Sequence, residues 1–337
     1  MTPKFVVFLW LINLICTDHT GFTSDGKIFD TQRKRNKVYH EAFCDKSRLQ
    51  GSGITVGVLD SSINVNHEVF KDSPLNGKNF VKDKRGDYWK TNCHCSHGTM
   101  VAGIVASIAK SASIYLCCIS DKGHYYPKDN VKLALQHLYN MDKHVDVVIM
   151  SFGQEKDTNS YYREEIDQLH SKGVVLISAA GNGGVYQRQV AHPARLDNVI
   201  AVGSICGYGD QCGEPSKFNP AETSWIDVYA PGETVHCPVH DDNESWKECG
   251  GTSCSAPAVG AVVAKLLEFS TINDPSLKQK IQDIRMLKKL FSSKESPFMC
   301  PKWDNCEEYV LHPKAAFQNE PAILLRKLNE FFELYSA

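Results

Sequence analysis

Five short runs of β-branched and aliphatic residues, separated by segments of helical periodicity, constrain the fold of this chain more than any other feature. The runs lack the polar alternation of a half-exposed strand, so they indicate strands that are buried on both faces. Buried strands that alternate with helices are typical of a parallel sheet covered by helices on both sides. The five runs occupy residues 54–59, 113–119, 145–150, 174–179 and 199–202.

The segments between the runs predict the helices. In 129–141 and 160–172, apolar residues recur every three or four positions, as on the buried face of a helix. Residues 97–109 and 253–269 are rich in alanine and valine, and the small residues of 97–109 permit close packing on a sheet. We therefore expect an α/β fold with three αβα layers and a mainly parallel sheet.

The N-terminal residues predict secretion. Lys4 and the apolar run over 5–16 have the form of a signal peptide, and the run is too short to span a bilayer. A strand or core helix is the alternative interpretation of this run. We assign 1–17 to the signal and 18–44 to a short polar arm, whose basic cluster at 33–35 is interpreted as a solvated charge cluster rather than a processing site. No later run predicts a membrane span.

Residues 45–272 contain all five runs and form the predicted main domain, whereas 273–337 are interpreted as a small helical C-terminal extension. Within the extension, 276–290 and 320–335 each predict one amphipathic helix. A cysteine- and proline-containing stretch at 297–313 separates them.

Thirteen cysteines favour an oxidising compartment. Removal of a signal peptide that includes Cys16 leaves twelve, an even number that suits several disulfides. The sequon Asn243-Glu244-Ser245 is consistent with a secreted glycoprotein. The sequence does not fix the connectivity, and the local candidates are Cys206 with Cys212, Cys237 with Cys249, and Cys300 with Cys306.

Charge excludes one class of partner. The chain has 37 basic and 39 acidic residues and a formal net charge of −2. This balance lacks the basic excess of nucleic-acid-binding proteins, so no nucleic-acid partner is expected.

Three short motifs supply the groups of a serine hydrolase. Asp60 ends the run 54–59, and ligand sites of open α/β sheets lie at that end of the strands. His97 begins a predicted helix in the motif His-Gly-Thr, and Ser253 begins another after Gly-Gly-Thr, where helix N-terminal N–H groups favour an oxyanion. Alone, each has an ordinary interpretation as a turn aspartate, a helix-cap or core histidine, and an N-cap serine.

Together the motifs resemble those of the subtilisin-like serine proteases, the subtilases. The chain order Asp60, His97, Ser253 is the order of that family. The resemblance covers about residues 45–270 and implies the subtilisin-like fold. Further matching segments are Met150–Gly153, Ser178–Asn182, His192–Ala194, Val199–Gly203 and Ala230–Gly232.

The resemblance implies a role for each motif. Ser253 attacks the scissile carbonyl, His97 accepts the serine proton, and Asp60 orients His97. Asn182 donates its side-chain amide to the oxyanion, beside the Ser253 backbone N–H. The protein is thus expected to be a secreted serine endopeptidase.

Substrate binding is implied in the same way. An extended polypeptide is expected to pair along Ser151, Phe152 and Gly153, next to Ala180 and Gly181. Polypeptide substrates and a proteinaceous inhibitor are the implied partners. No cofactor is expected to be required, no metal ligand is assigned, and no calcium site is clear, although many relatives bind calcium.

Three positions and one region depart from the family pattern. Ser62 replaces a usual glycine, Met100 a frequent second histidine, and Cys254 a usual methionine, yet no triad atom is lost. The arm 18–44 is too short for the folding chaperone that precedes most secreted members. Folding without a chaperone, a chaperone supplied by another chain, a truncated sequence and a protein that does not mature into an active enzyme are the open explanations. The alternative function is a catalytically silent subtilase-like protein that binds peptides or inhibitors.

Two other chemistries are weighed against this one. Thiol and imidazole groups at 93–97 could form a zinc cluster, but no second cluster follows at finger spacing, and disulfides suit a secreted chain better. The α/β-hydrolase motif requires glycine where Ser255 stands. Glu155 would favour a basic P1 residue, but the adjacent Lys156 offsets it, so we expect broad rather than dibasic cleavage.

Overall fold

Eight strands of the described chain form one sheet in the order β2-β3-β1-β4-β5-β6-β7, with β8 paired to β6 as well. Every pair is parallel except β6 with β7. The strands are β1 (Thr55–Ser61), β2 (Leu75–Asn79), β3 (Ser113–Ser120), β4 (Val147–Met150), β5 (Val175–Ala179), β6 (Ile200–Cys206), β7 (Glu214–Pro215) and β8 (Val228–Pro231). The five predicted runs are confirmed as β1, β3, β4, β5 and β6.

This computed structural model describes residues 49–82, 88–90, 97–123, 125–154, 161–206, 214–233, 235–293, 296–297 and 321–335. Several predictions fall outside this part of the chain. They are the signal peptide, the polar arm, the cluster at 93–96, the pair Glu155 and Lys156, most of the stretch at 297–313, and the cysteines at 212, 300 and 306.

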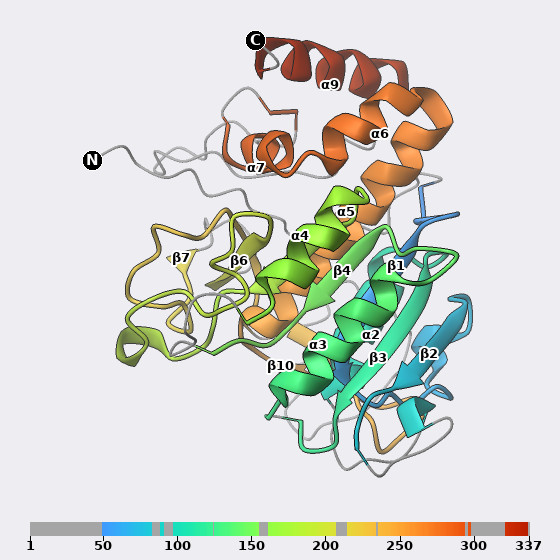
Figure 1. The fold of residues 1–337 in the computed structure, drawn as a ribbon, viewed down its shortest axis with the longest axis vertical. Helices are drawn as coiled ribbons and strands as arrows, with labels where there is room; N and C mark the ends of the chain where they lie inside the picture. Colours follow the sequence, from blue (N-terminus) through green and yellow to red (C-terminus); the bar gives the residue numbers. More distant parts are fainter. Residues whose placement is uncertain are drawn as a thin grey trace, which may run out of the picture.

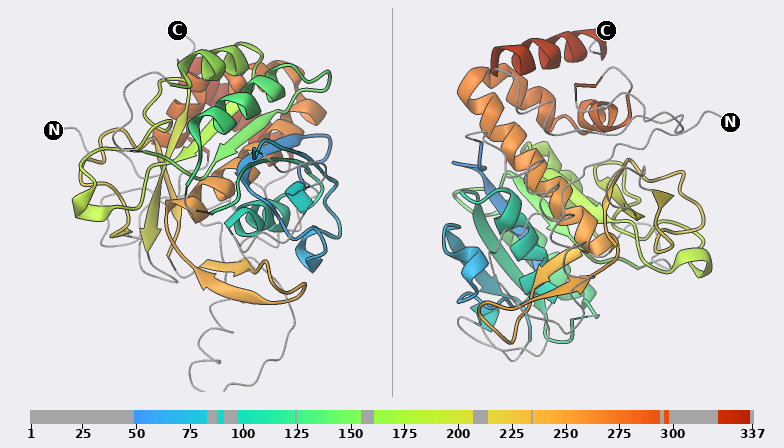
Figure 2. Two further views of the ribbon diagram at one scale, coloured as in Figure 1. Left: turned by 60° about the horizontal axis from the view of Figure 1, so that its bottom comes forward. Right: turned by 180° about the vertical axis from the view of Figure 1, so that it is seen from behind.

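Helices cover both faces of the sheet, as predicted (Figure 1). Helices α3 and α4 lie on one face, and α2 and α5 lie on the other, which faces the viewer in the right panel of Figure 2. The helices are α2 (His97–Ile108), α3 (Lys128–Tyr139), α4 (Arg163–Ser171), α5 (Thr252–Asn273), α6 (Pro275–Gln282), α7 (Ile284–Ser292) and α9 (Pro321–Tyr335), with 3-10 turns η1 (Glu68–Phe70), η2 (Tyr88–Lys90) and η3 (Gly184–Tyr186).

The alternation of β1 side chains explains the two cores. Val56 and Val58 belong to the cluster shared with α2 and α5, whereas Leu59 packs with Val131 and Leu135 of α3. Because both faces of β1 are covered, the strand carries apolar residues on both faces rather than on one. This burial is the physical basis of the continuous aliphatic runs in the sequence.

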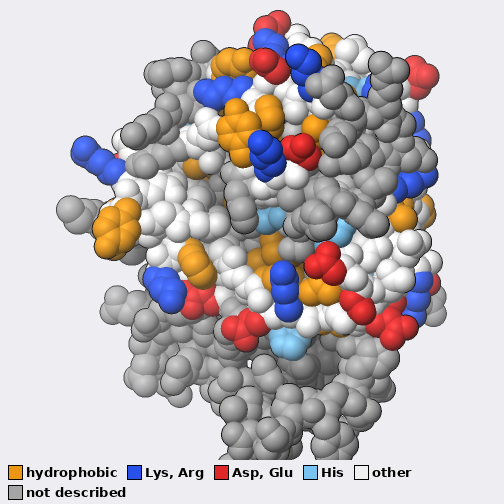
Figure 3. All heavy atoms as spheres, turned by 90° about the horizontal axis from the view of Figure 1, so that it is seen from below, with side chains coloured by type: hydrophobic (Ala, Val, Ile, Leu, Met, Phe, Trp, Pro, Cys, Tyr) orange, Lys and Arg blue, Asp and Glu red, His pale blue; other side chains and the backbone are white. Residues whose placement is uncertain are grey.

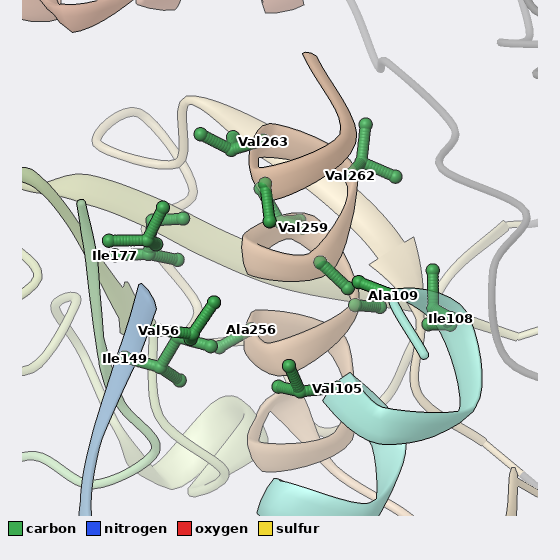
Figure 4. Close-up of a cluster of buried hydrophobic side chains, with 14 of the residues drawn as sticks. Val56, Val105, Ile108, Ala109, Ile149, Ile177, Ala256, Val259, Val262 and Val263 are labelled. Carbon is green, nitrogen blue, oxygen red and sulfur yellow. The ribbon is translucent and has the colours of Figure 1, made fainter. Parts of the chain in front are cut away.

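Helix α5 is the central helix of the larger core. Figure 4 shows Ala256 and Val259 of α5 beside Val56, Ile149 and Ile177 of the sheet. Among the described helices, α5 alone is long and apolar enough to cross a membrane, but 89% of its most apolar window is buried inside the molecule. Its apolar composition is therefore explained by core packing.

The C-terminal segment corrects one prediction. Residues 276–290 do not form a single helix, because Asp283 ends α6 in an extended conformation and caps α7. The Asp283 carboxylate accepts hydrogen bonds from the backbone N–H groups of Arg285 at 2.9 Å and Met286 at 3.4 Å. The helix predicted at 320–335 is confirmed as α9. Buried residues of α6, α7 and α9 join the same hydrophobic cluster as α5.

A two-stranded hairpin completes the end of the molecule where α5 begins. Strands β9 (Val235–Pro238) and β10 (Trp246–Cys249) pair in antiparallel fashion. Figure 2 shows this hairpin at the bottom of both views, next to the first turn of α5. Strand β10 is joined to α5 by Gly250 and Gly251 alone, so the position of the hairpin constrains the start of the helix.

Candidate active site

The parallel sheet places Asp60 where sequence reasoning expected it, at the carboxyl end of β1. Its side chain is fully buried, and Oδ1 accepts a hydrogen bond from the Ser61 backbone N–H at 2.7 Å. His97 Nδ1 lies 2.9 Å from both Oδ1 and Oδ2 of Asp60. A buried carboxylate that contacts one ring nitrogen can fix both the orientation and the tautomer of the imidazole.

Gly98 explains how α2 brings His97 to the end of β1. A Cβ atom at Gly98 would lie only 2.4 Å from the backbone oxygen of Ser61. The Gly98 N–H donates a hydrogen bond of 2.9 Å to Ser61 Oγ, which fastens the helix start to the strand. The next residue, Thr99, accepts from the Asn64 N–H at 3.0 Å. The motif His-Gly-Thr therefore secures the first turn of α2 on the loop after β1.

Ser253 occupies the first turn of α5 at the same edge of the sheet. Its side chain is 8% exposed, and its hydroxyl donates a hydrogen bond of 3.0 Å to the backbone oxygen of Ser151, just beyond β4. Ser253 and His97 make no direct hydrogen bond with each other, and His97 Nε2 has no hydrogen-bond partner among the described residues. Both residues line the same cleft, but the serine hydroxyl is turned to a backbone acceptor. Catalytic hydrogen bonds are often long or poorly aligned in unliganded enzymes.

Asn182 lies directly against the start of α5. Its Oδ1 accepts hydrogen bonds of 2.8 Å from both the backbone N–H and the hydroxyl of Thr252. Its Nδ2 donates no hydrogen bond within the described part of the chain. The anchored oxygen orients the amide, and the remaining N–H groups are available to an anion in the cleft.

The charges around His97 set its proton affinity. Burial alone lowers the pKa of His97, but the charge and hydrogen bond of Asp60, together with the charge of Cys249, raise the pKa above its ordinary value of 6.5. Asp60 therefore favours the imidazolium form, which is the form that appears when a histidine accepts a proton from serine.

His97 and Ser253 line one cleft of about 770 Å³. Asp60 does not line this cleft but contacts His97. Asn182, Ser151, Phe152, Gly153 and Gly181 also line this cleft. Ala180 differs from the prediction, because it is fully buried below the cleft. Its N–H donates to Val202 and its carbonyl accepts from Ala191, so neither group is presented to a substrate. Ala179 lines the cleft instead.

Tyr126 is a site residue that sequence reasoning missed. Its hydroxyl donates to the Gly123 backbone oxygen at 2.9 Å and lies 3.1 Å from His97 Nδ1 and 3.4 Å from Asp60 Oδ1. Its ring stacks on Phe152 with centroids 4.7 Å apart. The residue comes from the loop between β3 and α3, where a tyrosine pair before proline is the only sequence signal.

Charged side chains of both signs are exposed at the lower end of the molecule (Figure 3). Figure 3 views the molecule from below, the end at which Figure 1 shows β10, and basic and acidic side chains are interspersed on the described surface. Within the cleft itself, Lys122 and Lys247 line the wall, and none of the described lining residues is an aspartate or glutamate. Among the described residues, no three His, Cys, Asp or Glu side chains are grouped to hold a metal ion.

Comparison with known proteins gives a consistent result. Residues 51–287 match the model of the subtilase family. The major intracellular serine protease of Bacillus subtilis (strain 168) is 27% identical over 255 residues, covering 72% of this chain and 76% of that protein. A subtilisin-like protease of Coccidioides posadasii (strain C735) is 27% identical over 234 residues, 67% of this chain and 54% of its own length.

Solved structures share the fold. The crystal structure of a cold adapted subtilisin-like serine proteinase superposes with a TM-score of 0.61 and 24% sequence identity. The superposition covers 79% of this chain and 91% of that chain. The three-layer architecture is therefore common to this protein and that proteinase.

Proposed function

Because the chain belongs to the subtilase family, whose members are serine endopeptidases, we propose that it hydrolyses peptide bonds with Ser253 as nucleophile, His97 as base and Asp60 as orienting carboxylate. The contact of His97 Nδ1 with both Asp60 oxygens at 2.9 Å, in a cleft that also contains Ser253, is the observation that carries this proposal. This arrangement leaves His97 Nε2 for the serine proton.

In the proposed reaction, the Ser253 hydroxyl leaves the Ser151 carbonyl and turns toward His97 Nε2. The Ser253 Oγ forms a bond to the scissile carbonyl carbon while His97 takes the proton, and the imidazolium is stabilised by Asp60. His97 then gives this proton to the leaving amine as the C–N bond breaks. Water hydrolyses the acyl-enzyme by the same steps in reverse, which restores the Ser253 hydroxyl.

The oxyanion is assigned to Asn182 and the start of α5. Thr252 holds the Asn182 amide by donating hydrogen bonds to Asn182 Oδ1. The N–H groups of Asn182 Nδ2 therefore need little reorganisation when negative charge develops. The backbone N–H of Ser253, in the first turn of a 22-residue helix, supplies the second donor and the positive end of the helix dipole.

The expected substrate is an extended polypeptide of broad sequence. Ser151, Phe152 and Gly153 continue from β4 along the cleft and offer an edge for strand-like pairing. The described wall of the cleft carries two lysines and no carboxylate, which disfavours selection of basic side chains. Peptide-library profiling should therefore show no preference for paired basic residues, and a strict dibasic requirement would contradict this.

Labelling with a fluorophosphonate probe tests the catalytic proposal. The purified wild-type protein is expected to form a covalent adduct at Ser253, and Ser253→Ala is expected to abolish it. Ser255→Ala is the matched control, because Ser255 lies in the same helix but its hydroxyl is buried against Ala230 and Pro231. A folded wild-type protein that is not labelled would instead support the catalytically silent, peptide-binding alternative.

Secretion is proposed from Lys4 and the apolar run over 5–16. The exposed position of Asn243 at the tip of the β9–β10 hairpin supports glycosylation there. Expression of the full chain in a secreting eukaryotic host should yield a processed N-terminus near residue 17 in the medium. Peptide mapping should find a glycan that Asn243→Gln removes, and retention of the unprocessed chain in cells would refute secretion.

A further inference from the structure

Cys249 lies in the wall of the catalytic cleft, a position that the triad mechanism does not use. It is the last residue of β10, it is half-buried, and it lines the cleft together with His97 and Ser253. The neighbouring Gly250 carries no side chain and lines the cleft as well. A group attached to the Cys249 sulfur would therefore extend into space that a substrate needs.

Two further cysteines, Cys237 and Cys254, are the neighbours to compare with Cys249. In the β9–β10 register, Cys237 is opposite Lys247 and Cys249 is opposite Val235, so the two cysteines are diagonal neighbours on one face of the hairpin. Both are free thiols here, so the disulfide predicted between them is not formed in this structure. The Cys237 Sγ donates to the Val235 backbone oxygen at 3.6 Å, and the Cys249 Sγ donates to the Lys247 backbone oxygen at 3.8 Å. Cys254 directly follows Ser253 in the first turn of α5.

Among these three cysteines, only Cys249 combines access with ready ionisation. The neighbouring Cys237 thiol lowers the pKa of Cys249, with further help from the positive charges of Lys247 and His97, and together they outweigh the effect of burial. By contrast, Cys237 and Cys254 are fully buried, and burial raises the pKa of Cys237 well above its usual range. The same holds for Cys117 on the other side of the sheet, which is fully buried with a raised pKa.

We propose that Cys249 is a modification site, at which small disulfides and soft electrophiles form an adduct that closes the catalytic cleft. This inference rests on the proposed protease function, since the blocked cleft is the one that contains Ser253. It adds a thiol-sensitive control to an enzyme whose chemistry uses no thiol.

The reaction with a small disulfide balances without another reagent. The Cys249 thiolate attacks one sulfur of the disulfide, a new S–S bond forms, and the original S–S bond breaks. The departing thiolate takes a proton from solvent and leaves as a thiol. The Cys249 sulfur is oxidised and the departing sulfur is reduced, and an added thiol reverses the exchange.

The test compares thiol modification with serine labelling on the same full-length protein. The protein is treated with a mild phosphine, which opens any Cys237–Cys249 disulfide, and the phosphine is removed. N-ethylmaleimide is then added, the modified cysteines are mapped by mass spectrometry, and fluorophosphonate labelling of Ser253 is measured. We expect Cys249 to react before Cys117, Cys237 and Cys254, and serine labelling to fall roughly 100-fold, because the adduct displaces the probe from its reactive position.

Two variants separate the possible causes, each compared with its own untreated sample. Serine labelling of Cys249→Ser should be insensitive to N-ethylmaleimide, whereas Cys117→Ala should remain as sensitive as the wild type. Replacing N-ethylmaleimide by a methanethiosulfonate should give a block that dithiothreitol reverses.

The failures can also be told apart. Absence of serine labelling in the untreated wild type would contradict the proposed protease function, and the mapping of Cys249 would still test its reactivity. Unchanged serine labelling after complete modification of Cys249, or modification of the buried cysteines first, would overturn the proposal.

Discussion

Asn182 and His97 each use one end of the side chain as an anchor and leave the other end for the cleft. Asn182 is held through Oδ1 by Thr252 at 2.8 Å, and His97 through Nδ1 by Asp60 at 2.9 Å. The side-chain atoms Asn182 Nδ2 and His97 Nε2 have no hydrogen-bond partner among the described residues. Such anchoring fixes the reacting groups before a substrate arrives, which lowers the reorganisation needed in the transition state.

His97 provides a direct test of the electrostatics. We expect a pKa above 6.5 for His97 in the inactive Ser253→Ala protein, because Asp60 and Cys249 outweigh burial. Adding Asp60→Asn should bring the pKa below 6.5, since burial then dominates. Titration followed by nitrogen-15 NMR of the imidazole measures both values. In the wild type, kcat/KM should fall as the pH drops through this raised pKa, because the protonated imidazole cannot act as the base.

Asn182→Ala tests the oxyanion assignment. In subtilisin itself, loss of one such donor lowers kcat by about 10²–10³-fold, and we expect a loss of the same order with little change in KM. Steady-state hydrolysis of a peptide amide measures it. Thr252→Ala is the matched variant, because it removes the hydroxyl that holds Asn182 Oδ1 but leaves both the Asn182 amide and the Thr252 N–H in place. A comparable loss in the two variants would argue that Asn182 only supports the local structure.

At the scale of elements, the start of α5 depends on the backbone before it. Gly251 has a φ of +110°, and a Cβ atom there would lie 2.8 Å from Asn182 Nδ2. The helix can thus begin beside Asn182 only if this position has no side chain. The hairpin β9–β10 delivers the chain to this point, so one connected segment carries Cys249, the glycines and Ser253.

Gly251→Ala should therefore damage the site as well as the backbone. The unfavourable φ costs about 1–3 kcal/mol of the free energy of unfolding, and the contact with Asn182 displaces an oxyanion donor. We expect fluorophosphonate labelling to slow by at least about tenfold. Gly53→Ala is the control, because Gly53 has a similar positive φ of +78° with nothing within 4 Å of its Cβ position. It should lose stability but keep its labelling rate, as judged by urea unfolding and labelling kinetics.

At the scale of the whole molecule, the sequence predicted the features that leave a local pattern, namely the fully buried strands and the short catalytic motifs. The strands β1, β3, β4, β5 and β6 were readable because they are buried on both faces, and the triad candidates because each sits at a strand end or helix start. Strand β2 was not predicted from the sequence, because it is only partly buried and most of its residues are polar. Tyr126 and Cys249 reach the site through a loop and a hairpin, whose paths depend on tertiary packing rather than on local pattern.

The C-terminal helices show the same dependence on tertiary structure. The sequence predicts that residues 273–337 are an extension packed on the main domain. Leu328 and Phe332 of α9 are fully buried in the cluster that also contains α5, α6 and α7. Figure 1 places α9 at the end of the molecule away from β10, and the last residue of β10, Cys249, lines the cleft. The extension therefore contributes to the main core at a distance from the chemistry.

Phe332→Ala measures this contribution. Loss of a fully buried phenylalanine should lower the free energy of unfolding by about 3–5 kcal/mol, because it removes apolar contacts and leaves a cavity. Leu334→Ala is the matched control on the same helix, since Leu334 is 60% exposed and should cost no more than about 0.5 kcal/mol. Urea unfolding followed by circular dichroism gives both values, and a single transition is expected because α9 and α5 share one core. A separate early transition, with Phe332→Ala affecting only that step, would instead show that α9 folds independently of the catalytic core.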